Sequence, residues 1–263
     1  MFKKRFEHLR ANRRAISTLA IILIVIVVVA SVVAGVVLLW WFGFWGQVVG
    51  SGNLATEDKD FTDFTIVDVG SGFEVEITQS SSYSISITAD DNVIDNIETS
   101  KTGDTLTIHL KWGFIVRSTT LRAEIRMPDL YELKFSGGTH GTVEGFTSTH
   151  EFAVDLSGGS RLSGNFTTSG DAQFALSGGS HLTGLDGAAN KLLISASGGS
   201  DLELSDFPVH DTTVNLSGGS SATINLDGRL DGDLSGGSHL KYVGNPTAVT
   251  TNTSGGSTIE KIG

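Results

Sequence analysis

The sequence predicts an all-β protein, a parallel β-helix or β-solenoid with roughly 20 residues per coil, preceded by an N-terminal transmembrane helix. Three observations predict it. The triplet Ser-Gly-Gly occurs seven times at a nearly constant spacing. Short runs that alternate apolar and polar residues precede the later triplets, as in half-buried strands. Residues 15–45 contain no charged residue.

The N-terminal segment has the pattern of a single-pass membrane anchor. Residues 1–14 hold six Lys and Arg against one Glu, and residues 15–45 exceed the roughly 20 apolar residues that a spanning helix needs. Trp40, Trp41 and Trp45 lie at the far end, where aromatic rings favour the membrane–water interface. The positive-inside rule then places residues 1–14 in the cytoplasm and everything after residue 45 outside it.

Two other interpretations of this segment stay open. A cleaved secretory signal fits less well, because its apolar region is about 7–15 residues long. The run Arg13-Arg14-Ala15-Ile16-Ser17-Thr18 resembles the amino terminus of archaeal type IV pilin-like proteins. That resemblance implies cleavage after Ala15 and packing of the apolar helix into a filament core.

Charge and cysteine content exclude several classes of protein. Residues 46–263 carry 12 Lys and Arg against 28 Asp and Glu, a net charge of −16, which argues against a nucleic-acid partner. The chain has no cysteine, so disulfides, thiolate metal sites and a thiol nucleophile are excluded.

Residues 46–60 are polar and contain Gly and Ser, and we interpret them as a linker. Residues 61–135 alternate apolar and polar positions without the triplet, and residues 92–97 could form one helical turn. We expect residues 61–135 to form irregular coils that cap the membrane-proximal end of the solenoid. Such a cap would cover a strand edge that otherwise promotes aggregation.

Residues 136–262 contain the repeats. Each later triplet follows an alternating strand, and an apolar residue recurs two positions after the Ser-Gly-Gly-(Ser/Thr) unit. One such short coil cannot bury its apolar face alone, whereas stacked coils can, and the period is too short for a propeller blade. The triplets begin at Ser136, Ser157, Ser177, Ser197, Ser217, Ser235 and Ser254.

The triplets are interpreted as sharp corners between strands. A corner repeated at one angular position needs positive φ or close backbone approach, which glycine permits, and stacked serines could hydrogen-bond along the ladder. An anion-binding glycine loop is disfavoured, since no helix and no Lys follow it. The corner glycines are Gly137, Gly138, Gly158, Gly159, Gly178, Gly179, Gly198, Gly199, Gly218, Gly219, Gly236, Gly237, Gly255 and Gly256.

The residue after each Ser-Gly-Gly-(Ser/Thr) unit should form one column along the solenoid, with neighbours about 4.8 Å apart. A solvated turn position is the favoured interpretation, because the column is chemically mixed. The alternative is a stripe that binds a glycan or an anion. Its members are His140, Arg161, His181, Asp201, Ser221, His239 and Thr258, of which the five charged or titratable ones are the candidate surface-binding residues.

No catalytic, metal or cofactor site is predicted. The histidines lack metal-motif spacing, the acidic residues lack calcium-loop spacing, and no Gly-x-Ser-x-Gly elbow occurs. Asn165, Asn215 and Asn252 stand in the sequence pattern of N-glycosylation acceptors.

Residues 60–262 resemble the putative auto-transporter adhesin family, also called the head GIN domain. The similarity is carried by Phe61-Thr62-Asp63-Phe64, by the run from Val69 to Gln79, by the run from Met127 to Leu133 and by the repeated Leu-Ser-Gly-Gly-Ser. Family members more often have Ser-Gly-Ala-Ser at the corner. The resemblance implies a right-handed single-stranded β-helix outside the cytoplasm and brings no catalytic residues.

The sequence therefore predicts a membrane-anchored, extracytoplasmic module that acts by surface contact with a cell-surface glycan or protein. Three alternatives remain: a pilin-like filament subunit, a structural spacer or sensor partner, and an enzyme acting on polysaccharide. The sequence leaves the ligand and the oligomeric state open.

Overall fold

A computed structural model describes residues 47–263, so the predicted cytoplasmic segment 1–14 and transmembrane helix 15–45 lie outside the described residues. The account below concerns the compact unit Val49–Gly263. No helix within the described part of the chain has the length and apolarity that a membrane span requires.

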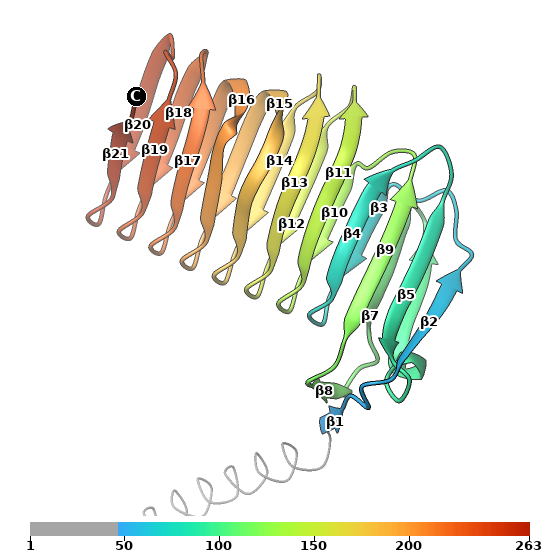
Figure 1. Cartoon of the computed structure of the whole chain (residues 1–263). Coiled ribbons are helices and arrows are strands. Elements are labelled where there is room, and N and C mark those ends of the chain that lie inside the picture. Colours follow the sequence, from blue (N-terminus) through green and yellow to red (C-terminus); the bar gives the residue numbers. More distant parts are fainter. Residues whose placement is uncertain (1–46) are drawn as a thin grey trace, which may run out of the picture. The chain divides into compact units, whose positions relative to one another are not determined.

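The described chain is built almost entirely of strands, with one 3-10 turn, η1 (Ile94–Asn96). Figure 1 labels most of them. The strands preceding the repeats are β1 (Gln47–Val49), β2 (Leu54–Lys59), β3 (Ile66–Val69), β4 (Glu74–Gln79), β5 (Ser84–Asp90), β6 (Ile97–Thr102), β7 (Thr105–Leu110), β8 (Ile115–Arg117) and β9 (Leu121–Met127). The strands of the repeats are β10 (Glu132–Phe135), β11 (His140–Ser148), β12 (Phe152–Leu156), β13 (Arg161–Thr168), β14 (Ala172–Leu176), β15 (His181–Ala196), β16 (Asp201–Leu216), β17 (Ser221–Leu226), β18 (Arg229–Leu234), β19 (His239–Val243), β20 (Ala248–Thr253) and β21 (Thr258–Lys261).

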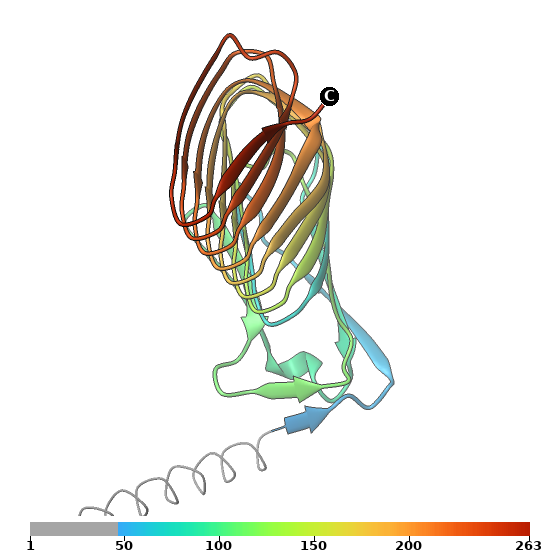
Figure 2. The ribbon, with the colours of Figure 1, turned by 90° about the vertical axis from the view of Figure 1, so that its left-hand side faces the viewer.

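Most of the strands form two parallel ladders that face each other, which is the stacked-coil solenoid that the repeat predicts (Figures 1 and 2). The first ladder consists of the strands that follow the corners, in the order β9, β4, β11, β13, β15, β16, β17, β19, β21. The second ladder consists of the strands that precede them, in the order β7, β3, β10, β12, β14, β15, β16, β18, β20. The long strands β15 and β16 belong to both ladders, their first part to one and their last part to the other.

The hydrophobic core fills the space between the two ladders. The predicted apolar position of the first ladder is buried in five successive coils, at Leu162, Leu182, Leu202, Ala222 and Leu240. The alternating apolar residues of the second ladder are buried in the same way, so the predicted inward faces are confirmed. Within this core lies a row of buried phenylalanines whose rings contact one another in turn, Phe146, Phe166, Phe152, Phe174 and Phe207.

The cap combines parallel and antiparallel strands and departs from sequence order. The β3–β4 coil pairs with β7 and β9 on one side and with β10 and β11 on the other, so the first coil in sequence lies second in space. Beyond it, β5 runs antiparallel to β9, β2 antiparallel to β5, and β6 antiparallel to β7. Strand alternation indicates that these segments are β, but not that the chain reverses direction there.

Residues 54–59, which the sequence places in a linker, form β2 and pair along their whole length with β5. The exposure of the side chains in β2 alternates because one face of the strand packs against the rest of the protein and the other faces solvent. The polar composition that indicates a linker is also what an edge strand needs, since charged side chains deter pairing with another chain.

Candidate functional site

The corners set the positions of every side chain on the first ladder. All fourteen predicted corner glycines have positive φ, between 61° and 81°. A Cβ on the first glycine of a corner would lie 3.0–3.3 Å from a backbone nitrogen of the neighbouring corner, and a Cβ on the second would meet almost nothing. The first position of a corner therefore requires glycine for two reasons, its positive φ and the close approach of the neighbouring backbone. The second position requires glycine only because of its positive φ.

An eighth corner lies at Gly70-Ser71-Gly72, which the search for Ser-Gly-Gly does not find. Ser71 has a φ of 67° and takes the place of the first glycine, packing against Gly137. The signal in the sequence is the Gly-Ser-Gly run directly before the alternating strand that begins at Phe73.

In six of the seven Ser-Gly-Gly corners, the residue after the two glycines supplies a hydroxyl that stabilises the turn. Each of these side chains is at most 1% exposed and donates to the carbonyl oxygen three residues earlier at 2.8–2.9 Å. At two places a backbone N–H of one corner donates to the hydroxyl of the equivalent serine in the next corner. These bonds run from Ser200 N to Ser220 Oγ and from Ser238 N to Ser257 Oγ. The expected serine ladder is thus mostly a set of bonds within each turn, at Thr139, Ser160, Ser180, Ser200, Ser220 and Ser238.

The predicted column is continuous in the structure. Each member is the direct register partner of the next, from His140 through Arg161, His181, Asp201 and Ser221 to His239 and Thr258. Two residues outside the repeats extend it, because Glu74 pairs with His140 and Arg122 pairs with Glu74.

The column members interact differently along its length. At one end Arg122 Nη2 lies 3.3 Å from Glu74 Oε2, and at the other His239 Nδ1 lies 2.8 Å from Thr258 Oγ1. In between, Arg161, His181 and Asp201 are consecutive, but within residues 47–263 none of them has an opposite charge within 4.0 Å.

A hollow of about 500 Å³ opens at the head of the column. Its ionisable lining residues are Glu74, Glu76, Arg122, His140 and Arg161. Its hydroxyl lining comes from Thr142, Ser163 and Thr183 on β11, β13 and β15. The other hollows described measure about 210–280 Å³. The sequence predicts the column but not this hollow, since Glu74, Glu76 and Arg122 lie outside the repeats.

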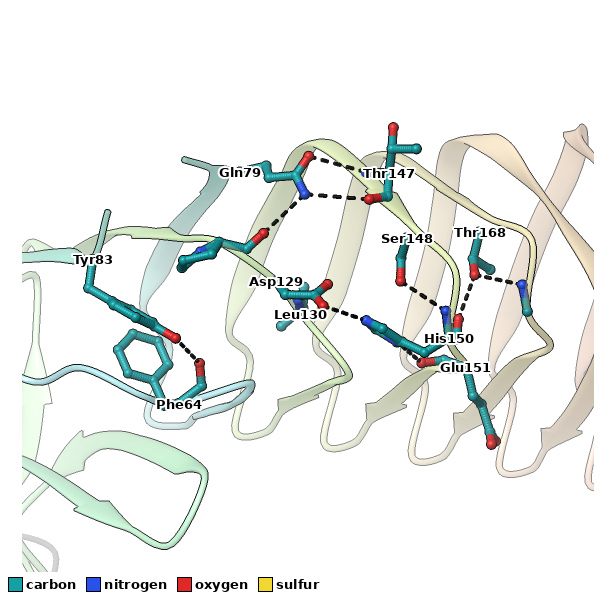
Figure 3. Close-up of polar contacts among 12 residues, drawn as sticks. Phe64, Gln79, Tyr83, Asp129, Leu130, Thr147, Ser148, His150, Glu151 and Thr168 are labelled. Carbon is teal, nitrogen blue, oxygen red and sulfur yellow. Dashed lines mark hydrogen bonds and ion pairs between the residues drawn. The ribbon is translucent and has the colours of Figure 1, made fainter. Parts of the chain in front are cut away.

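A second polar cluster joins the cap to the repeats (Figure 3). His150 Nε2 lies 2.8 Å from Asp129 Oδ2, and its Nδ1 lies 2.7 Å from the carbonyl oxygen of Glu151. The ring stacks on Tyr131 with centroids 3.4 Å apart and an interplanar angle of 7°. We assign this cluster to the structure of the junction, because His150 is largely covered.

Polar residues that hydrogen-bond between neighbouring coils are separated in the sequence by about one repeat period. This signal was not used to predict contacts from the sequence. Asp129 and His150 are 21 residues apart, and Asn252 donates to Asp233 over 19 residues. A third pair is formed by His210 and Asp227, whose Nδ1 and Oδ1 atoms lie 2.8 Å apart. The hydrogen bond that His210 donates to the carboxylate of Asp227 raises the pKa of His210.

Of the three glycosylation-type asparagines, all are exposed and two are engaged. Asn165 Oδ1 accepts a hydrogen bond from Gly145 N, and Asn252 Nδ2 donates to Asp233. Asn215 has an outward position in the second ladder. Within residues 47–263 no three His, Asp or Glu side chains gather as metal ligands would.

Comparison with protein families identifies a matching family. The profile of the family described as "Putative auto-transporter adhesin, head GIN domain" matches residues 63–246. No curated protein matches the sequence.

Several solved structures have the same fold. A putative adhesin from Bacteroides fragilis NCTC 9343 is 21% identical with a TM-score of 0.77, covering 82% of this chain and 100% of its own. A putative lipid binding protein from Parabacteroides distasonis ATCC 8503 is 18% identical with a TM-score of 0.67 and the same coverage. A putative adhesin from Parabacteroides merdae ATCC 43184 is 19% identical with a TM-score of 0.64, covering 83% of this chain and 100% of its own.

Proposed function

Because the chain belongs to the putative auto-transporter adhesin, head GIN domain family, we propose that it is an adhesin-like protein that acts by surface contact and not by catalysis. In this proposal a right-handed β-helix stands outside the cytoplasm, and residues 15–45 form a single-pass membrane anchor. Residues 1–14 are then the cytoplasmic end.

The hollow at the head of the column carries the proposal. It lies where outward side chains of β4, β9, β11 and β13 converge, and its volume of about 500 Å³ is within the range of ligand sites. The strands beneath it are fixed by parallel pairing and by the buried core, so the site needs little ordering when a ligand binds.

The lining favours a glycan that bears a carboxylate. Arg161 and His140 are neighbours on the column, and Arg161 has no acidic partner among the described residues. A guanidinium recognises a carboxylate through two parallel hydrogen bonds. The hydroxyls of Thr142, Ser163 and Thr183 offer donors and acceptors for sugar hydroxyls along the same hollow.

The other ligand classes are less well supported. The charged and hydroxyl lining suits a glycan better than a lipid, the ligand class in the name of the Parabacteroides distasonis protein. A catalytic role would need an acid, base or metal constellation that acts on the bound sugar, whereas the similar structures from Bacteroides fragilis and Parabacteroides merdae are named as putative adhesins.

The test is binding of the full chain, reconstituted in lipid nanodiscs, to a panel of neutral and carboxylated glycans. We expect Arg161→Ala combined with His140→Ala to abolish binding of the carboxylated members. The matched control is Asp231→Ala combined with Thr213→Ala on the outward face of the second ladder, which should bind like the unchanged chain.

Each alternative has its own outcome. Glycan binding that is kept by Arg161→Ala combined with His140→Ala but lost with His181→Ala combined with Asp201→Ala would place the binding site at His181 and Asp201 instead of at the hollow. No glycan binding by the unchanged chain would favour the spacer or sensor partner. Product formation from a glycan would favour the enzyme, and an N-terminal mass that begins at Ile16 would favour the pilin-like subunit.

A further inference from the structure

Exposed apolar side chains gather at one place on the unit Val49–Gly263, here called the base and formed by residues 49–54, 90–96 and 111–120. Among the described residues seven large hydrophobic side chains are exposed, and four of them belong to the base. These are Val49 at 60%, Leu54 at 58%, Trp112 at 100% and Ile115 at 48% exposure. Clustered exposed apolar residues mark interaction surfaces, whereas isolated ones are ordinary.

Hydrogen bonds hold the three segments of the base together. Gly50 N donates to Arg117 O, and Asn92 Nδ2 donates to Val49 O. The carboxylate of Asp90 accepts from Gly52 N at 2.6 Å and from Thr120 N at 2.8 Å. The apolar side chains are therefore displayed on a connected surface.

Trp112 is held at the tip of a tight turn. Phe114 N donates to Lys111 O at 3.0 Å, and Gly113 supplies the positive φ of 79° that this turn needs. Lys111 N in turn donates to Asn96 O, and Lys111 Nζ donates to Asp95 O. The bonded turn keeps the indole in solvent, so its exposure is a property of the fold.

The chain leading into the base indicates what covers it. Val49 follows Trp45 by four residues, and an extended chain of that length reaches about 14 Å. With Trp45 at the outer bilayer surface, as the proposed anchor has it, the base cannot lie far from the lipid headgroups. The base contains Asp90, Asp91 and Asp95 against Lys111 and Arg117, a net charge of −1, so apolar insertion and not attraction to anionic lipid would drive contact.

We propose that the base docks on the outer surface of the bilayer that holds the chain, with Trp112 inserted at the lipid–water interface. Indole favours this interface because one edge is apolar and its N–H can hydrogen-bond. The contact rests on the proposed membrane anchor and goes beyond it, since it fixes the solenoid against the membrane and does not leave it on a free tether.

The test uses the full chain with Trp40→Phe, Trp41→Phe and Trp45→Phe, so that Trp112 is the only tryptophan. The chain is reconstituted in phosphatidylcholine vesicles with and without lipids brominated near the headgroup. We expect the brominated lipids to cause a loss of Trp112 emission, and aqueous iodide to quench it poorly. The matched control adds Trp112→Phe and Leu193→Trp, because Leu193 is 39% exposed on the second ladder. Its emission should be quenched by iodide and unaffected by bromine.

The outcomes separate the two proposals. A chain that does not float with the vesicles overturns the anchor and the docking with it. A chain that floats while Trp112 behaves like the Leu193→Trp control overturns the docking alone. Protection of Trp112 from iodide without quenching by brominated lipid would also overturn it, because a second protein would then cover the base.

Discussion

At the scale of single residues, the corner glycines show that two neighbouring residues of one type can have different roles. A Cβ at Gly198 would lie 3.2 Å from the backbone nitrogen of Gly178, whereas one at Gly199 would meet nothing within 4 Å. Backbone cannot give way as a flexible side chain can. The stacking distance of the coils thus depends on the first glycine of each corner.

We expect Gly199→Ala to lower the free energy of unfolding by about 1–2 kcal/mol, the cost of a left-handed conformation for a residue with a Cβ. Gly198→Ala should cost more, because the same conformational cost is joined by the backbone contact. Urea unfolding of the full chain, followed by circular dichroism, measures both. Equal losses would mean that the close approach carries no energetic weight.

The charge state of Asp90 depends on hydrogen bonds that the fold provides. Hydrogen bonds from the Thr119 hydroxyl, Thr120 N and Gly52 N to its carboxylate lower its pKa below the usual value. A lowered pKa contributes stability that is present above the unfolded-state value, about 3.9, and is lost as the pH falls through the folded-state value.

The expected result for Asp90→Asn follows from the lowered pKa of Asp90. At pH 7 the variant should unfold at lower urea than the unchanged chain, because an amide cannot accept all three hydrogen bonds in this geometry. The difference should shrink as the pH is lowered through and below 3.8. A difference that stays constant with pH would show that the ionised carboxylate is not what the three donors stabilise.

At the scale of elements, the phenylalanine row ties neighbouring coils together. The rings of Phe152 and Phe166 stack with centroids 3.7 Å apart, and Phe166 also stacks on Phe146 at 5.9 Å. We expect Phe166→Ala to lower the free energy of unfolding by about 3–5 kcal/mol, since the cavity cannot close between fixed strands. Leu193→Ala, an exposed substitution in β15, should change it by less than about 0.5 kcal/mol. Similar effects of the two variants would refute a tightly packed row.

The regular coils were predictable because their period repeats in the sequence, while the cap was not. In the repeats one offset from the corner fixes the inward leucines and the outward column, so burial of Leu182 and pairing of His181 with Asp201 follow from spacing. The position of the β3–β4 coil depends on contacts between segments far apart in the sequence, such as β4 and β11. No local pattern specifies such a pairing, and alternation is the same for parallel and antiparallel strands.

The same distinction applies to the candidate site, since some of its residues belong to the repeats and others to the cap. Arg161 and His140 belong to repeats, and their adjacency was predictable from the period. Glu74 and Arg122 join them only because the cap coils stack out of sequence order. The hollow therefore arises where the regular and irregular parts meet.

At the scale of the whole molecule, the net charge of −16 on residues 46–263 destabilises the folded state. Like charges repel more in the compact state than in the unfolded chain. Within residues 47–263 only four ion pairs between Lys or Arg and a carboxylate offset it, and each is partly exposed, so they contribute little.

Screening should therefore stabilise the protein. The Debye length falls from about 30 Å at 0.01 M to about 8 Å at 0.15 M salt, which removes repulsion between charges on different coils. We expect the urea midpoint of the full chain to rise over this range of sodium chloride. The variant Glu144→Gln combined with Asp206→Asn neutralises two exposed carboxylates on the first ladder side, and its midpoint should rise less. A midpoint that falls with salt would mean that attractive pairs, and not the net charge, dominate the electrostatics of the solenoid.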